Sequence, residues 1–490
     1  MISIVFVVSV TMLMMAVFPI LIHWFLIPVA LSGILIGTDA IRWFRGEFDV
    51  MDVRGILALV GLHFFWFSAL LIPANGYTPF PLAGVQNLDF RPWLGVMGVF
   101  NCAGILLYQW TATWISSRPF KKPVKVRRGD LKMVWILIFM IIVGFISQGF
   151  LLATLGLEVK SHWGERRVFS SGFGIPIVFR SCVPILLMFL ITCFSLSARH
   201  KTKSLFVLSA ILLVLTGISL IFNGLTGNRG STVFTAFWIV GVIHYFWRPI
   251  RRYEIIILVV CFLLFMFTYL FYKQYGVYGL KTFLNEGAQA AQATGRDRIE
   301  RSFSGMLVGD MSRSHIHSYA AYVLIQEPYS YRLRYGATVP ADIMSIVPRW
   351  LFPNQYNVGG YSGKHVAGTE MIRGPNTFDA YTMMGREPRM WGIAGNMMLN
   401  FGIYSVPFGY LILGVFVGWS QRVVRKWRAT SDIRLLFAPL LVMLALIILA
   451  MDPQVMTMYT LRYFMLPILI VFFGSNYIGK YMVPLREVAK

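Results

Sequence analysis

The strongest constraint on this chain is its series of long apolar runs. Each run is about 17–25 residues long, which at about 1.5 Å per helical residue matches the hydrocarbon core of a bilayer. Backbone amides find no water in that core, so a run of this length has to form a helix. We therefore predict an all-α polytopic membrane protein with about twelve transmembrane helices. They are expected at residues 3–20, 21–37, 55–73, 93–115, 133–157, 173–196, 204–222, 232–247, 254–272, 392–418, 435–451 and 456–479.

Composition excludes several other classes of protein. The chain has 490 residues, of which 57% are hydrophobic and 13% charged, and its net charge is +23. In a soluble chain that charge would suggest nucleic-acid binding, but much of it lies in short loops beside apolar runs, where membrane orientation explains it. The four cysteines lie inside apolar segments and lack the close spacing of zinc or disulfide frameworks. We expect no nucleic-acid partner, no metal and no cofactor.

The distribution of Lys and Arg between alternating loops predicts the orientation. One set of loops, with the C-terminal tail, carries 24 basic residues, whereas the short loops of the other set carry only five. Since basic loops stay in the cytoplasm, both termini are predicted to be cytoplasmic. The first apolar stretch, from Ile2 to about Thr38, is too long for one ordinary span, so we divide it near Pro19–His23.

One connection is far longer than the others. Residues 273–391 separate the ninth and tenth predicted spans and lie outside the cytoplasm by the same count. Segments 284–311 and 313–331 within it resemble short amphipathic helices punctuated by Gly and Pro. We divide the chain into nine transmembrane helices in 1–272, a large extracytoplasmic loop in 273–391 and three transmembrane helices in 392–490.

Three arginines are placed where the membrane makes a charge costly. Arg180 and Arg462 lie about six or seven residues inside predicted spans, and Arg229 lies in the turn before another span, all near the outer headgroup level. Guanidinium groups at that depth suit a lipid phosphate or a diphosphate, which they grip bidentately. The alternative is that each side chain extends to ordinary phospholipid or pairs with a carboxylate such as Asp452.

The large loop supplies further candidates. A sugar hydroxyl that acts as nucleophile needs a base, and the residues proposed for this role are His315, His317, Glu370 and Asp379. Arg349 and Arg373 are proposed as further ligands of a diphosphate or glycan, although a solvated basic surface would explain Arg373 equally well. The pair of histidines in "HIH" is weak evidence for a metal, because no third ligand stands at a useful spacing.

Two short motifs, together with the late outer loop, resemble those of a known family. The motifs are Gly227–Gly230, "GNRG", before a span, and Pro348–Pro353, "PRWLFP", in the large loop. The prolines of the second motif bar a continuous helix through Arg349. With the Asn400–Gly402 run that follows the loop, the chain is similar to the Wzy-type polymerases of bacterial polysaccharides. It departs from that family's pattern after Pro353, where Asn354-Gln355-Tyr356 replaces the usual Asn-Lys-Pro.

This resemblance implies a membrane glycosyltransferase of the bacterial cytoplasmic membrane. Such an enzyme moves a growing glycan from polyprenyl diphosphate to the non-reducing end of a lipid-linked repeat unit, with inversion and without a metal. Its implied partners are polyprenyl-diphosphate-linked oligosaccharides, membrane lipids and a chain-length regulator. Arg180, Arg229, Arg349, Arg373 and Arg462 would then bind the diphosphate and glycan.

Three other functions compete with this interpretation. A ligase of the O-antigen type also uses a large late loop and would pass the finished glycan to another acceptor. A transporter or flippase for the lipid-linked oligosaccharide is less favoured, because we find no internal repeat and the intramembrane charges gather near one face. A lipid-sugar transferase that uses Glu47 and Asp49 would need these residues outside, whereas the charge count places them in the cytoplasm.

Overall fold

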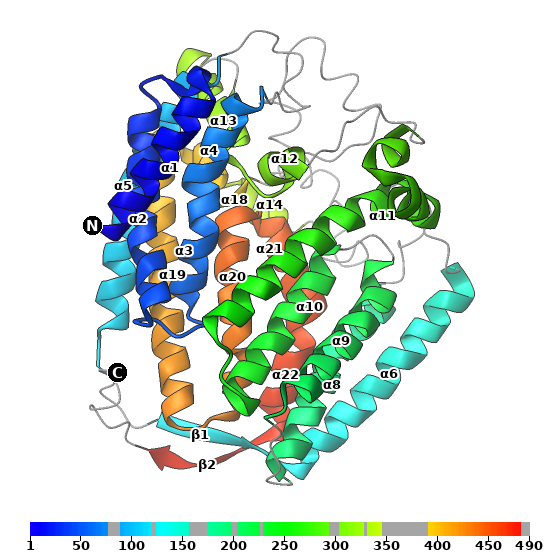
Figure 1. Ribbon diagram of the computed structural model, residues 1–490. Helices are drawn as coiled ribbons and strands as arrows, with labels where there is room; N and C mark the ends of the chain where they lie inside the picture. The colour runs from blue at the N-terminus through cyan, green and yellow to red at the C-terminus, as the bar shows by residue number, and fades with distance from the viewer. Residues whose placement is uncertain are drawn as a thin grey trace. The chain divides into compact units, whose positions relative to one another are not determined.

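The fold is almost entirely helical. The computed structural model describes residues 1–76, 89–119, 124–155, 174–197, 203–225, 229–293, 303–327, 331–344 and 391–481 (Figure 1). In these ranges eleven helices are long and apolar enough to cross a membrane. They are Leu26–Arg45, Val53–Ala74, Arg91–Ser116, Leu131–Thr154, Ile175–Ser197, Leu205–Gly224, Arg229–Trp247, Arg252–Tyr269, Ile403–Ala429, Ile433–Ala450 and Pro453–Gly474. The prediction of an all-α polytopic membrane protein is confirmed at this level.

The structure differs from the predicted spans at three places. The first predicted span, 3–20, falls on helix α1 (Ile2–Val17), which has only 16 residues. The tenth, 392–418, is broken at Gly402, whose φ of 83° is a conformation that other residues rarely adopt, so the spanning helix there begins at Ile403. The ninth continues without a break to residue 293 as the 42-residue helix α11 (Arg252–Ala293) and so enters the predicted loop.

The chain forms two compact units that interleave along the sequence. Unit 1 comprises Met1–Arg118, Ser302–Arg422 and Leu444–Met458, and unit 2 comprises Pro119–Arg301, Val423–Met443 and Tyr459–Lys490. Besides α1, the elements of unit 1 are η1 (Pro19–Leu21), α2 (Leu26–Arg45), α3 (Val53–Leu62), η2 (His63–Phe67), α4 (Ser68–Ala74), α5 (Arg91–Ser116), α12 (Phe303–Gly305), η6 (Met306–Asp310), α13 (Ser314–Gln326), α14 (Thr338–Met344), α18 (Gly392–Phe401), η8 (Ile403–Ser405), most of α19 (Val406–Ala429), the second half of α20 (Ala438–Ala450) and α21 (Pro453–Tyr459) up to Met458.

Helix α2 is central to unit 1, because it packs against α1, α3 and α5. Small residues allow the close approaches between these helices. Gly98 of α5 faces the backbone of Pro28, and Gly414 and Gly418 of α19 face the carbonyls of Tyr108 and Ala112 on α5, where an added Cβ would stand 2.7 Å from each oxygen. Such a small-xxx-small pair is typical of helices that pack closely in membranes.

Unit 1 also holds a buried ion pair. Asp52 caps the start of α3 by accepting hydrogen bonds from the backbone N–H groups of Arg54 and Gly55. Arg54 donates from Nε to Asp39 of α2 at 2.7 Å and from Nη1 to Thr113 of α5 at 2.7 Å. The side chains of Arg54 and Asp39 are only 7% and 1% exposed, so the pair links three candidate spans in a dry environment.

Unit 2 is built on helices that pack around α8. Its elements are β1 (Val124–Gly129), α6 (Leu131–Leu155), α8 (Gly174–Ser197), α9 (Leu205–Ser219), η4 (Leu220–Gly224), α10 (Arg229–Val242), η5 (Ile243–Trp247), α11, η9 (Ile433–Phe437), the first half of α20, η10 (Thr460–Phe464), α22 (Met465–Gly474) and β2 (Ser475–Tyr481). Helix α8 packs against α6, α9 and η10. Gly144 of α6 lies directly against Val183 of α8. The indole of Trp238 donates to the carbonyl of Leu436 at 2.8 Å and so ties α10 to η9.

A two-stranded sheet joins distant parts of unit 2. Strands β1 and β2 lie side by side and antiparallel, with Lys125 opposite Lys480 and Arg127 opposite Tyr477 (Figure 1). Three of the eleven candidate spans precede β1, and the other eight lie between the strands. The sheet therefore joins two segments that are separated along the chain by eight candidate spans.

Candidate functional site

Two of the predicted arginines come together in unit 2. Arg180 lies on α8 and is 7% exposed, and Arg462 lies on the π-helical turn η10 and is half-buried. Nη1 of Arg180 donates to Oε1 of Gln148 on α6 at 3.3 Å, and Nε of Arg462 donates to the hydroxyl of Ser181 at 3.1 Å. Ser181 directly follows Arg180 on α8, so this hydrogen bond brings the Arg462 side chain to the same turn of that helix. Residues that are 282 positions apart therefore form one cationic site.

A pair of buried polar side chains fixes Arg462 in this place. The hydroxyl of Ser181 donates to Oδ1 of Asn223 at 2.9 Å, and both residues are fully buried. Asn223 lies on the π-helical turn η4, so both η4 and η10 deliver a side chain to the same hydroxyl. A π-helical turn breaks the regular spacing of side chains along a helix and is common at functional sites.

Among the residues that the structure describes, neither Arg180 nor Arg462 forms an ion pair with a carboxylate, and Nε of Arg180 is buried without a hydrogen-bond partner. Asp452, the carboxylate considered from the sequence as a partner, instead accepts from the backbone N–H of Trp391 in unit 1. Burying a guanidinium without a counter-charge is costly unless an anion completes the site.

Arg229 belongs to the same unit and opens α10. Tyr459 lies three residues before Arg462, and its ring stacks edge-on against Phe234 of α10 at 5.0 Å between centroids. Helix α11 holds the end of η4, since the hydroxyl of Tyr272 donates to the carbonyl of Leu225 at 3.0 Å. The three arginines predicted to line one depth of the membrane thus lie in one compact unit.

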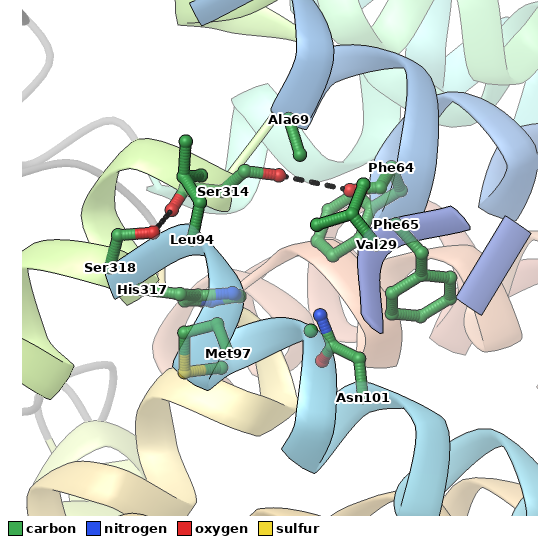
Figure 2. A pocket seen from close by; sticks show the side chains of 11 residues that line it. Val29, Phe64, Phe65, Ala69, Leu94, Met97, Asn101, Ser314, His317 and Ser318 are labelled. Carbon is green, nitrogen blue, oxygen red and sulfur yellow. Dashed lines mark hydrogen bonds between the residues drawn. The ribbon is translucent and has the colours of Figure 1, made fainter. Parts of the chain in front are cut away.

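The two histidines lie in unit 1, on α13. His315 is fully buried, and His317 is 2% exposed. Nε2 of His317 lies 2.7 Å from the carbonyl oxygen of Trp391, so this nitrogen carries the proton and donates it. The ring borders a small cavity lined by Val29, Phe64, Phe65, Ala69, Leu94, Met97, Gly98, Asn101, Ser314, His317 and Ser318 (Figure 2).

Burial controls the protonation of His317. It lowers the pKa of the imidazole from 6.5 to about 4, so the ring is neutral at neutral pH. The hydrogen bond to Trp391 acts in the opposite direction but is the weaker effect. A neutral ring whose Nε2–H is committed to a carbonyl has only its Nδ1 lone pair left to accept a proton.

We expect acid to destabilise the protein through His317. The unfolded chain takes up a proton near pH 6.5 and the folded protein only near pH 4, so the free energy of unfolding should fall as the pH is lowered through this window. His317→Gln keeps a donor for the Trp391 carbonyl and removes the titration. Thermal stability of the detergent-solubilised protein, measured from pH 7 to pH 4, should decline less steeply in this variant. Equal slopes would contradict the assignment.

One amide side chain anchors part of the large loop on unit 1. Asn400 of α18 is 1% exposed and accepts at Oδ1 from the backbone N–H of Gly336 at 3.0 Å. Its Nδ2 donates to the hydroxyl of Thr338 at 2.7 Å, and Tyr335 donates its backbone N–H to the Asn400 carbonyl at 2.9 Å. The Asn400–Gly402 run noted in the sequence therefore fastens the segment that leads towards Arg349.

Four of the proposed site residues lie outside the described residues: Arg349, Arg373, Glu370 and Asp379. Within the described part of the chain, no group of three or more His, Cys, Asp or Glu side chains is arranged to hold a metal ion.

The sequence interpretation missed three polar residues of the arginine site: Gln148, Ser181 and Asn223. Each lies in a candidate span, where a polar side chain must find a partner because the bilayer offers none. A search for polar residues inside apolar runs would have selected all three, together with many that only bond to their own helix.

Comparison of the chain with protein-family models, with curated proteins and with solved structures found no match. The fold and composition define an α-helical polytopic membrane protein, and its most distinctive described site is a cationic one within the candidate spans.

Proposed function

We propose that the protein is a polysaccharide polymerase of the bacterial cytoplasmic membrane. It transfers a growing glycan from polyprenyl diphosphate to the non-reducing end of a lipid-linked oligosaccharide repeat unit. The observation that carries this proposal is the pair of guanidinium groups, Arg180 and Arg462, that meet within candidate spans without a carboxylate partner in the described chain. A lipid-linked diphosphate combines the charge that this pair needs with a chain that resides in the membrane.

The reaction is a single displacement at the anomeric carbon of the donor. A hydroxyl oxygen of the acceptor sugar attacks that carbon, the bond from the carbon to the diphosphate oxygen breaks, and the electron pair leaves with polyprenyl diphosphate. The configuration at the carbon inverts. Negative charge grows on the diphosphate as the bond breaks, and fixed guanidinium groups stabilise it there, so this mechanism assigns no step to a metal.

The attacking hydroxyl loses its proton to a base during this step. The candidates are His315, His317, Glu370 and Asp379, and the loop arginines Arg349 and Arg373 are proposed to hold the glycan or the diphosphate. In this proposal both termini are cytoplasmic, and the large loop and the reaction lie outside. The substrates are polyprenyl-diphosphate-linked oligosaccharides, with membrane lipids and a chain-length regulator as further partners.

The proposal is tested first with the purified protein and a synthetic polyprenyl-diphosphate-linked repeat unit. We expect extension into longer lipid-linked glycans in the presence of a chelator, and we expect Arg349→Ala to abolish extension while the protein still folds. A strict requirement for a divalent metal, or a fully active Arg349→Ala variant, would contradict the mechanism.

A deletion strain separates the polymerase from its rivals. Single repeat units on the lipid carrier at the outer leaflet are expected if the protein is a polymerase. Long glycans on the carrier would identify a ligase, and repeat units retained at the inner leaflet would identify a transporter or flippase.

A further inference from the structure

The two-stranded sheet of unit 2 carries exposed cations that the proposed reaction does not use. Lys125 and Arg128 are exposed on β1, and Lys132 is exposed on the first turn of α6, directly after the strand. We call these three residues the basic ribbon. In the part of the chain that the structure describes, none of them forms an ion pair with a carboxylate.

Two neighbouring cations, Arg127 and Arg434, are already bonded within the protein, and within the ribbon Lys125 also places its Nζ over the ring of Tyr477, 5.7 Å from the centroid. Arg434 pairs with Asp432 at 2.5 Å, and the backbone N–H of Arg127 donates to the same carboxylate at 3.1 Å. The guanidinium of Arg127 lies over the rings of Phe472 and Tyr477, about 4 Å from each centroid. Thus Asp432, the buried acid of this region, is already bonded to the guanidinium of Arg434 and to the backbone N–H of Arg127, and it is not free to pair with the ribbon.

Asp130 lies between Arg128 and Lys132 in the sequence but is already hydrogen-bonded. The exposed carboxylate of Asp130 accepts from the side chain of Asn476 at 2.7 Å and from the backbone of Leu131. An external anion would offset the repulsion that remains along the ribbon.

Large apolar side chains border the ribbon. Leu131, Trp135 and Phe473 are 67%, 64% and 65% exposed, and they begin or end the candidate spans next to the strands. Leu131 and Trp135 are four residues apart on α6 and so share one face of the helix, beside Lys132. Exposed apolar residues followed at once by unpaired cations are typical of a helix end that meets lipid headgroups.

We propose that the basic ribbon binds the headgroup of an anionic phospholipid. Arg128 and Lys132 contact the lipid phosphate, Lys125 adds to the positive potential beside it, and Leu131, Trp135 and Phe473 contact the acyl chains. A lipid satisfies both halves of this surface, whereas a soluble phosphate would leave the apolar half without a partner. This site is distinct from the Arg180 and Arg462 site and does not depend on the proposed reaction.

The test is native mass spectrometry of the full-length protein titrated with phosphatidylglycerol or phosphatidylcholine. The variant K125Q/R128Q/K132Q removes the ribbon, and the control R45Q/R118Q/K203Q removes three exposed cations at or near the ends of three other helices. We expect the wild type to prefer phosphatidylglycerol. The ribbon variant should bind it at least about tenfold more weakly, since each basic residue near the surface contributes a factor of about five. The control should stay within about twofold of the wild type.

Three results would overturn the proposal. The first is equal weakening of phosphatidylglycerol binding in the ribbon variant and the control, which would indicate an effect of net charge alone. The second is unchanged phosphatidylglycerol binding in the ribbon variant. The third is full displacement of phosphatidylglycerol by inorganic phosphate, which would indicate a site for a soluble anion. Elution volume and thermal stability are recorded for both variants so that the lipid counts refer to folded protein.

Discussion

Replacing Arg462 with alanine is expected to slow glycan extension by a factor of about 100 to 1,000, the usual effect of removing one group that stabilises developing negative charge. Arg462 is held by Ser181, the residue after Arg180, and forms no ion pair with a carboxylate in the described part of the chain, so in the proposed reaction its guanidinium is placed to bind the leaving diphosphate. The rate constant kcat should fall more than KM rises, because the charge on the diphosphate grows in the transition state.

Two further variants sharpen this prediction. Arg462→Lys keeps the charge but loses the planar fork and the Nε contact with Ser181, so it should restore only part of the rate. Arg251→Ala, which removes an exposed arginine of the same unit, should leave the rate unchanged. An Arg462→Ala protein that elutes as the wild type and extends glycans at its rate would rule out this role for the site.

Ser181→Ala provides a separate measure of how much the rate depends on the position of the Arg462 guanidinium. It removes the hydroxyl that links Arg462 to Asn223 but leaves both guanidinium groups in place. We therefore expect a smaller loss of kcat than for Arg462→Ala, in keeping with the loss of one hydrogen bond to a charged group. If the double variant is no slower than Arg462→Ala alone, Ser181 acts through Arg462.

The sequence predicted the helices well because the length of an apolar run is a local property. Eleven of the twelve expected spans meet the criterion of length and composition in the structure, and the remaining one coincides with the shorter α1. The break at Gly402 escaped prediction because the chain is apolar on both sides of it, so hydropathy alone does not reveal the change in backbone direction.

Contacts between distant residues were much harder to predict. The sequence selected Arg180 and Arg462 because a charge in an apolar run is costly, but nothing local shows that Ser181 bonds to a residue 281 positions away. The pairing of β1 with β2 was missed for the same reason, since "VKVRRG" reads as one more basic loop. Arg54 was likewise counted among the loop cations, whereas the structure buries it against Asp39.

The Asp39 and Arg54 pair leads to the prediction with the largest expected effect on stability. Asp39→Ala should lower the free energy of unfolding by about 3–5 kcal/mol, because it leaves the buried guanidinium of Arg54 without its counter-charge. Glu47→Ala is the matched control. It also removes a carboxylate paired with an arginine at 2.8 Å, but both side chains of that pair are more than 40% exposed, so its loss should cost about 0–1 kcal/mol.

A double variant decides what the buried pair contributes. Asp39→Leu with Arg54→Met replaces both charges with apolar side chains, and its stability should lie well above that of Asp39→Ala, because no unpaired charge remains in the interior. Equilibrium unfolding in mixed micelles provides the comparison. If the double variant is as unstable as Asp39→Ala, then the hydrogen bonds of Arg54 to Thr113 and of Gln109 to Asp39, rather than the unpaired charge, account for the loss.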